Sequence, residues 1–162
     1  GSIAGAHDAI SALPGLHVVA ETVVAVHHCL LGTPSTDFAQ ITTVLCHPVA
    51  LAQCTQFFAE HTHLEVHPSY DTAGAAMDVS KVADPSVAAV ASRRAALHYD
   101  LKVLRANLED REDNQTRFLA ISRAPLPLPE QTPVRTMFVV RTGDTPGSLL
   151  RVLQPLARHG VS

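Results

Sequence analysis

Short apolar segments alternate with segments of helical periodicity through the middle of this chain, and this alternation constrains the fold more than any other feature. Buried-strand patterns at residues 41–45 and 87–91 are each followed by a stretch that carries helix start signals. Pro48 suits a first helical turn, and Asp71 and Ser92 are preferred N-cap residues. Strands and helices at this spacing are typical of parallel βαβ units with right-handed crossovers. The sequence therefore predicts an α/β fold with a mostly parallel sheet.

The same patterns extend the predicted order of elements to both sides of this region. The expected strands are residues 17–31 (one long strand or two consecutive ones), 41–45, 64–67, 87–91, 103–108, 117–121 and 136–141. The expected helices are residues 3–13, 48–61, 72–82, 93–99 and 148–158. In the expected helix 48–61, Leu51, Cys54 and Phe58 fall on one apolar face.

Residues 123–133 contain four prolines and little apolar periodicity, so they are predicted to form a semi-rigid linker. Beyond them lie one expected strand, a turn at residues 143–147 and one expected helix. A single βα unit is too small to fold alone. The chain therefore divides into a main domain at residues 1–122, the linker at 123–133, and one small βα unit at 134–162.

Composition excludes some classes of function. The chain has 162 residues and a net charge of −3, which gives no electrostatic footprint for nucleic acid or an anionic membrane. No apolar run approaches the roughly 20 residues that span a bilayer. Its three cysteines have scattered positions, which indicates reduced thiols rather than a disulfide framework. The start Gly1-Ser2, without methionine, is typical of residues left by a vector, so we expect native sequence upstream.

Two corners of the predicted sheet are suited to binding a carboxylate. In open α/β sheets, ligands bind beyond the carboxyl ends of strands, where helix N-termini present free amides. The first corner is Cys46-His47-Pro48 with Gln53 nearby, and the second is the segment 69–74, which contains Asp71 and Thr72. A purely structural interpretation, in which Asp71 and Thr72 only cap a helix, stays open.

A polar segment at residues 113–116 leads into an apolar strand and presents Thr116 and Arg117 at its start. A polar segment at the start of a strand can offer a hydroxyl and a guanidinium to a ligand with carboxylates. Adjacent strand residues point to opposite faces. If Thr116 faces the ligand, Arg117 does not face it directly, and a structural ion pair is the alternative for Arg117. Phe118 returns to the Thr116 face, where we expect it to pack.

These residues belong to a series of motifs that resembles a known family. In order they are His27-His28-Cys29-Leu30-Leu31, Cys46-His47-Pro48-Val49-Ala50-Leu51-Ala52-Gln53-Cys54, Asp71-Thr72-Ala73-Gly74-Ala75-Ala76, Ala89-Val90-Ala91-Ser92 and Asn114-Gln115-Thr116-Arg117-Phe118. Over residues 2–122 this order is similar to prephenate dehydratase and the related arogenate dehydratases. Residues 138–162, with Pro146-Gly147-Ser148-Leu149-Leu150, resemble the first strand and helix of an ACT regulatory domain.

The resemblance implies a fold and a place for the site. The family fold has two α/β lobes, like a type II periplasmic binding protein, with the active site between them. This chain would hold the second lobe and the strands that return to the first, followed by a partial ACT unit. Most of the first lobe would lie upstream of Gly1. Ser2 would be either the last residue of the family's Glu-Asn-Ser hinge or vector sequence.

The resemblance also implies an activity. The family are carbon-oxygen lyases that convert prephenate to phenylpyruvate in phenylalanine biosynthesis, with loss of water and CO₂ and without a metal or cofactor. Thr116 would hydrogen-bond the leaving hydroxyl, because a threonine is a poor general acid. The implied substrate-binding residues are Cys46, Gln53, Thr72, Arg117 and Ser2. Arogenate differs from prephenate by an amino group in place of a keto group and remains an alternative substrate.

Regulation, assembly and location follow from the same resemblance. Gly147, Ser148, Leu149 and Leu150 resemble the loop that binds phenylalanine between paired ACT domains. The intact protein would be a homodimer or homotetramer in the cytoplasm, or in a plastid if the source is a plant. With an incomplete ACT unit and without the first lobe, this chain alone is expected to be inactive and to give no phenylalanine response.

Two positions depart from the family pattern, and three interpretations of other kinds stand beside it. Cys46 stands where serine is usual and would donate a weaker hydrogen bond, and Asp71 stands where many members have serine.

A metal site at His61, His63 and His67 lacks a full ligand set. Cys46 is poorly placed to act as a nucleophile with its neighbour His47. A ligand-binding module without catalysis is the alternative of another class.

Overall fold

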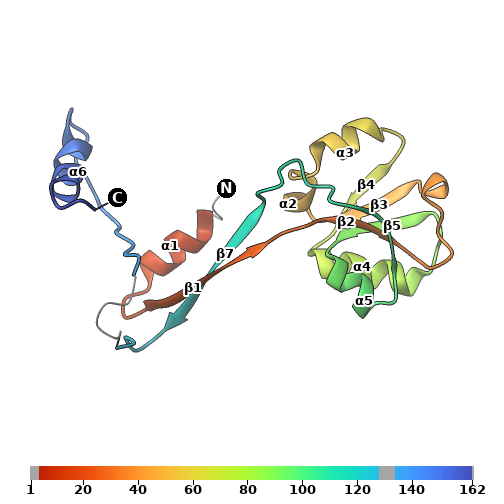
Figure 1. Cartoon of the computed structure of the whole chain (residues 1–162), viewed down its shortest axis with the longest axis horizontal. Helices are drawn as coiled ribbons and strands as arrows, with labels where there is room; N and C mark the ends of the chain where they lie inside the picture. The colour runs from red at the N-terminus through yellow and green to blue at the C-terminus, as the bar shows by residue number, and fades with distance from the viewer. Residues whose placement is uncertain (1–3, 128–133, 162) are drawn as a thin grey trace. The chain divides into compact units, whose positions relative to one another are not determined.

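The computed structural model describes residues 4–127 and 134–161 and separates into two compact units. The larger unit comprises Ala20–Leu119, and the smaller comprises the two ends of the chain. The helices and strands along the chain are drawn in Figure 1. No helix within the described ranges is long and apolar enough to cross a membrane.

The larger unit is built on a five-stranded sheet with the strand order β4-β3-β5-β2-β6. The strands are β2 (Cys29–Gly32), β3 (Thr43–Cys46), β4 (Glu65–Pro68), β5 (Val87–Ala91) and β6 (Lys102–Ala106). β3 runs parallel to β4 and β5, whereas β2 runs antiparallel to β5 and β6. The sheet is therefore mixed: β3, β4, β5 and β6 run in one direction and β2 runs against them, so the prediction of a mostly parallel sheet holds for every strand except β2. The α/β class itself is confirmed.

The antiparallel strand has a simple cause in the connection that follows it. β2 reaches β3 through a short 3₁₀ turn, η1 (Phe38–Gln40), and no crossover helix intervenes. β5 lies between β2 and β3 in the sheet, and because β2 and β3 run in opposite directions, the chain passes from one to the other at the same end of the sheet without a crossover. The segment 17–31, predicted as one or two strands, is two: β1 (His17–Ala25) and β2.

Helices cover both faces of the sheet, as Figure 1 shows for α2 and α3 on one side and α4 and α5 on the other. On the first face, Leu30, Val44 and Val90 are fully buried in the largest core cluster. On the second face, Leu31 and Ala89 are fully buried in clusters with residues of α4 and α5. Neighbouring residues of a strand thus serve opposite cores, as the pleat requires.

Two helices were predicted closely because their N-caps are local. α4 (Thr72–Val82) begins after Asp71, whose carboxylate accepts a 2.5 Å hydrogen bond from the Gly74 amide. α5 (Arg93–His98) begins after Ser92, whose hydroxyl accepts from the Ala95 amide at 3.2 Å. A capping side chain satisfies an amide that the helix leaves unpaired, and so fixes the first turn.

The predicted single helix at residues 48–61 is two helices, α2 (Pro48–Leu51) and α3 (Thr55–Glu60). The break is imposed by Asp110, which is distant in sequence. Its carboxylate accepts hydrogen bonds from the amides of Thr55 at 3.0 Å and Gln56 at 2.9 Å, and so starts a second helix. The Asp110 amide also donates to the carbonyl oxygen of Gln53 at 2.7 Å. Gln53 therefore lies in the bend between the two helices.

β1 and β7 (Gln115–Ser122) form a separate two-stranded sheet. The strand predicted at 117–121 is thus confirmed, and it is slightly longer than expected.

In the smaller unit, α1 (Ala4–Ala12) and α6 (Ser148–Arg158) match the predicted helices. The strand expected at residues 136–141 is wrong, because no described strand pairs with this segment. Without a partner its backbone has no ladder, and Phe138 and Val139 remain exposed. Gly147 precedes α6 with φ at 82°, a left-handed conformation that favours glycine. Most of the expected linker, residues 128–133, lies outside the described residues.

Candidate active site

One edge of the sheet collects the ends of several strands and the start of another. Cys46 at the end of β3 lies opposite Pro68 at the end of β4. Cys29 at the start of β2 lies opposite both Ala91, the end of β5, and Ala106, the end of β6. Because β2 is antiparallel, the residues before it meet the carboxyl ends of the other strands. This edge, which we call the carboxyl edge, is where α/β sheets bind ligands.

Gln53 is held at the carboxyl edge by three segments that are distant in sequence. Its side-chain oxygen Oε1 lies 2.8 Å from His28 Nε2 and accepts a hydrogen bond from Asn114 Nδ2 at 3.1 Å. No group among the described residues bonds its Nε2 atom, and no buried side-chain nitrogen or oxygen there lacks a partner. The Gln53 NH₂ group therefore reaches solvent and can donate to a ligand.

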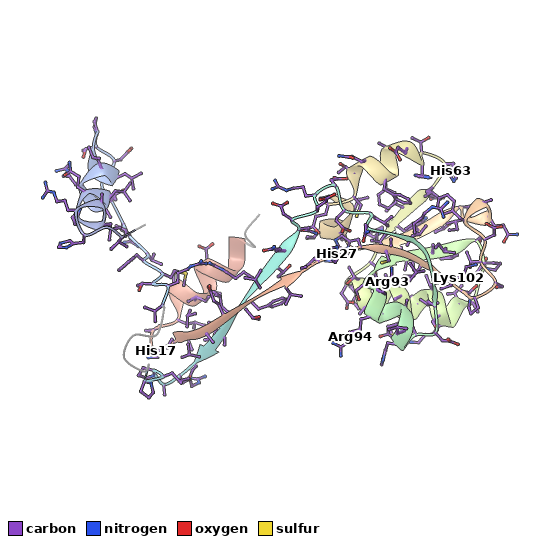
Figure 2. The ribbon with its side chains drawn as sticks, in the orientation of Figure 1. His17, His27, His63, Arg93, Arg94 and Lys102 are labelled. Atoms are coloured by element: carbon purple, nitrogen blue, oxygen red, sulfur yellow. The ribbon has the colours of Figure 1, made fainter. Side chains whose placement is uncertain are left out.

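Glu109 supports this arrangement from below the surface. Its side chain is 4% exposed, lies 2.7 Å from His27 Nδ1, and accepts from the His28 amide at 2.8 Å. Burial tends to raise the pKa of the Glu109 carboxyl, whereas hydrogen bonds from His27 and the His28 amide lower it, and the net direction is downward. The ionised carboxylate thus anchors the segment before β2, where Figure 2 labels His27.

Thr116 lies two positions after Asn114. Thr116 belongs to β7, whereas Asn114 lies just before that strand. Thr116 is half-buried, and no group in the described part of the chain hydrogen-bonds its hydroxyl. Asn114 contacts Gln53, so Thr116 follows closely in the chain on the segment that holds the Gln53 amide.

The neighbours of Thr116 have other surroundings. Arg117 Nη1 lies 3.7 Å from Glu21 Oε2 on β1, so the structural ion pair is the arrangement observed. Phe118 is 55% exposed, so the described residues do not bury it as expected.

The first predicted corner is partly buried. Cys46 is 1% exposed in the core, and its Sγ lies 3.5 Å from the carbonyl oxygen of His47. Burial raises the pKa of the Cys46 thiol to about 11 and that of Cys54 to about 12. His47 Nδ1 accepts from the Val49 amide at 3.2 Å and caps α2. The Cys46 thiol is thus buried and protonated, and His47 Nδ1 is engaged by a backbone amide, which argues against a Cys46 nucleophile.

The second predicted corner lies at the start of α4. Asp71 uses its carboxylate as an N-cap, so its charge is engaged by the helix. Tyr70 lies over the first turn, where a Cβ atom at Gly74 would clash with its ring. Thr72 is half-buried in that turn, and no described contact links it to Gln53 or Thr116. The structural interpretation thus accounts for Asp71, while the amide of Thr72 remains a candidate donor.

The other residues named from sequence lie elsewhere. Ser2 falls outside the described residues. Gly147, Ser148, Leu149 and Leu150 begin α6 in the smaller unit, where the Ser148 hydroxyl lies 2.7 Å from the Thr145 hydroxyl. His61 stacks on Phe57, and His67 pairs with Glu65 at 3.0 Å. No group of three potential metal ligands occurs in the described residues.

Four residues at the carboxyl edge were not predicted. His28 and Asn114 lie inside the quoted motifs, so the motifs were the signal that could have found them. Glu109 carries no such signal. Arg93 begins α5 (Figure 2) and is close enough to Cys29 to lower the pKa of that thiol, although burial outweighs it and the net shift is upward. An exposed guanidinium at this edge favours an anionic ligand.

The chain is thus an α/β protein whose carboxyl edge carries donors of the kind that suit a carboxylate-bearing small molecule. Residues 1–126 match the family model described as prephenate dehydratase, so this chain belongs to the prephenate dehydratase family.

Individual relatives agree with this assignment. The chain is 33% identical to the bifunctional chorismate mutase/prephenate dehydratase of Enterobacter agglomerans over 99% of the chain and 41% of that protein. It is 37% identical to the chloroplastic arogenate dehydratase/prephenate dehydratase 1 of Arabidopsis thaliana over 91% of the chain and 37% of that protein. It is also similar to the crystal structure of Arthrobacter aurescens prephenate dehydratase in complex with L-Phe, with a TM-score of 0.80, 29% identity, and coverage of 99% and 54%. The chain thus spans about half or less of the length of these relatives.

Proposed function

We propose that this protein acts as a prephenate dehydratase, converting prephenate to phenylpyruvate in phenylalanine biosynthesis. Two hydrogen-bond donors carry the proposal. Asn114 and His28 occupy the Gln53 oxygen and leave its NH₂ group for a ligand, and Thr116, two positions after Asn114, has a hydroxyl without a described partner. A donor for a departing hydroxyl beside a donor for a carboxylate is what this reaction requires.

In the proposed reaction, prephenate consumes one proton and yields phenylpyruvate, CO₂ and water. The bond between the ring and its carboxylate breaks, and its electron pair enters the ring as the bond to the hydroxyl breaks. Aromatisation drives both steps, so the protein mainly has to orient the substrate. Gln53 donates to a substrate carboxylate, and the Thr116 hydroxyl donates to the leaving oxygen. No metal or cofactor takes part in this scheme.

The other binding residues have supporting roles in the proposal. The amides at the start of α4, including that of Thr72, supply the positive end of the helix dipole. Arg117 stiffens β7 through Glu21 and contributes charge from the opposite face. Cys46 acts through the backbone near it, because its thiol is buried. Ser2 is proposed to complete the site from the hinge.

Replacing Thr116 tests the proposal against a ligand-binding module without catalysis. In the intact protein, we expect Thr116→Ala to lower kcat by about 10²-fold, comparable with the loss of one transition-state donor. Thr116→Ser keeps the hydroxyl and should retain most of the rate. Phenylpyruvate absorbance gives the rate, and calorimetry should show that binding changes only a few-fold. Weakened binding without a change in kcat would refute the catalytic role.

Substrate choice and regulation are also proposed. Arogenate is the alternative substrate, and a side-by-side assay of both compounds decides between them. We propose that the fold is the second lobe of a type II periplasmic-binding-protein-like structure, followed by part of an ACT unit. In the intact cytoplasmic or plastid protein, a homodimer or homotetramer would bind phenylalanine through residues 147–150. A calorimetric titration with phenylalanine tests this, and a Leu150→Ala variant should weaken the response.

A further inference from the structure

The hydrogen bonds around Gln53 include the backbone carbonyl oxygen of Val26, which can only act as an acceptor. Asn114 Nδ2 lies 3.3 Å from the carbonyl oxygen of Val26 and 3.1 Å from Gln53 Oε1. The Val26 amide donates to the carbonyl oxygen of Asn114 at 2.9 Å, so the two segments are also fixed by their backbones. A carbonyl oxygen only accepts hydrogen bonds, so the atom of Asn114 that faces it must be the NH₂ group.

This fixed end determines the direction of every hydrogen bond that follows. The Asn114 NH₂ group has two hydrogens, one for Val26 and one for Gln53, so Gln53 must present its oxygen. His28 Nε2, 2.8 Å from the same oxygen, must then carry a hydrogen. Rotating the Asn114 amide by half a turn would place its oxygen against the Val26 oxygen, two acceptors without a hydrogen between them. Amide orientations are assigned from such networks.

We infer that Asn114 and His28 are positioning residues that lock the Gln53 amide with its NH₂ group facing the ligand. Gln53 is then an obligate donor, and the ligand group that meets it must be an acceptor, a carboxylate or carbonyl oxygen. The proposed function supplies only the identity of the ligand, and the direction of the network stands on the geometry alone. His28 is 6% exposed and acts through Gln53 without reaching the ligand itself.

The backbones that carry these side chains are held in place as well. The buried Glu109 carboxylate accepts from the His28 amide, and the Leu108 amide donates to the His28 carbonyl at 3.0 Å. The Asp110 amide donates to the Gln53 carbonyl. The segment 108–110 therefore fixes His28 and Gln53 together, as a preorganised donor requires.

The tautomer of His28 tests the direction of the network without any activity measurement. In the ¹⁵N-labelled full chain at mildly alkaline pH, a long-range ¹H–¹⁵N spectrum of the imidazoles distinguishes the two tautomers. Comparison with His28→Gln assigns the His28 signals. We expect hydrogen on Nε2. A neutral His28 with hydrogen on Nδ1 would mean that Gln53 presents its NH₂ group to His28, and would overturn the inference.

Asn114→Asp tests the lock itself, because aspartate has the shape of asparagine but only accepts. We expect the Gln53 amide to turn so that its NH₂ group faces the introduced carboxylate and His28, and the His28 hydrogen to move to Nδ1. In the intact protein, the KM for prephenate should rise about tenfold with a smaller change in kcat, the pattern of lost ground-state binding. An unchanged tautomer, or a moved hydrogen with unchanged KM, would overturn the inference.

Two variants of His28 distinguish a positioning role from an effect on folding. His28→Gln can place a donor near Nε2, whereas His28→Leu cannot. We expect His28→Gln to keep KM within a few-fold and His28→Leu to raise it further at comparable thermal stability. Equal KM values would contradict the positioning role. A protein that shows the Nε2–H tautomer but makes no phenylpyruvate would refute the proposed function and still support the locked amide.

Discussion

Removing the Glu109 carboxylate should destabilise the larger unit measurably, because this buried charge anchors the segment before β2. The His27 ring is 55% exposed, so its interaction contributes less than about 1 kcal/mol. The bond from the His28 amide to the buried carboxylate contributes about 1.5–3 kcal/mol. We therefore expect Glu109→Ala to lower the free energy of unfolding by about 2 to 4 kcal/mol.

The matched control is Glu112→Ala, three residues further along the same segment. Glu112 is exposed, so its loss should change the free energy of unfolding by less than about 0.5 kcal/mol. Urea unfolding followed by far-ultraviolet circular dichroism measures both variants at neutral pH. If Glu109→Ala unfolds at the same urea concentration as Glu112→Ala, the anchoring role is refuted.

The pH dependence of the same variant gives a second check with a defined sign. The pKa of Glu109 is lowered in the folded state, so its stabilising effect is complete above its ordinary pKa of about 4.3. The effect disappears as the pH falls through the lowered pKa of the folded protein. The difference between wild type and Glu109→Ala should therefore shrink in acid. A difference that stays constant from neutral pH into acid would show that packing, not charge, causes the loss.

Three further predictions concern residues around the site. Gly74→Ala places a methyl group where the Tyr70 ring lies, but the Tyr70 side chain is 66% exposed and should move away, so α4 should keep its stability. Any remaining loss of stability should disappear when Tyr70→Ala is added. A large loss of helical circular dichroism signal would contradict this prediction. Burial raises the pKa of Cys46 to about 11 and that of Cys54 to about 12. Both thiols should therefore react slowly with a disulfide reagent at neutral pH in the native protein, and rapidly in urea. Fast reaction in the native protein would contradict this prediction. Arg117→Gln breaks a partly exposed ion pair and should cost less than about 1 kcal/mol in urea unfolding, and a larger loss would indicate a buried role.

What the sequence predicted well was determined by nearby residues. α4 and β5 were predicted with their observed bounds, because Asp71 caps the helix and the apolar run 87–91 is short and continuous. Gln53 was named from a motif, and it lies at the carboxyl edge, where His28 and Asn114 hold its amide. Local signals suffice where the capping or packing partner lies within a turn or so of the residue.

What the sequence did not predict depends on contacts between distant segments. Asp110 divides the helix expected at 48–61, and Glu109 holds His28 from 81 positions away. No periodicity or spacing rule links such residues, because the fold alone brings them together. The segment 136–141 has the residue types of a strand, but a strand also needs a partner with which to pair.

The reversed direction of β2, which the sequence did not predict, also explains why His28 was missed as a site residue. If β2 ran parallel to β5, its first residue would lie at the opposite edge of the sheet. That edge is about 13 Å from the ends of β3 and β5, because β2 is four residues long. His28 would then be out of reach of Gln53, and no lock on the amide could form. Because β2 is antiparallel to both neighbours, its start meets the carboxyl edge, and β6 delivers the segment 107–110 to the same place. The reversed strand in the mixed sheet thus brings the His28 imidazole to Gln53 and the Glu109 carboxylate to the His28 amide.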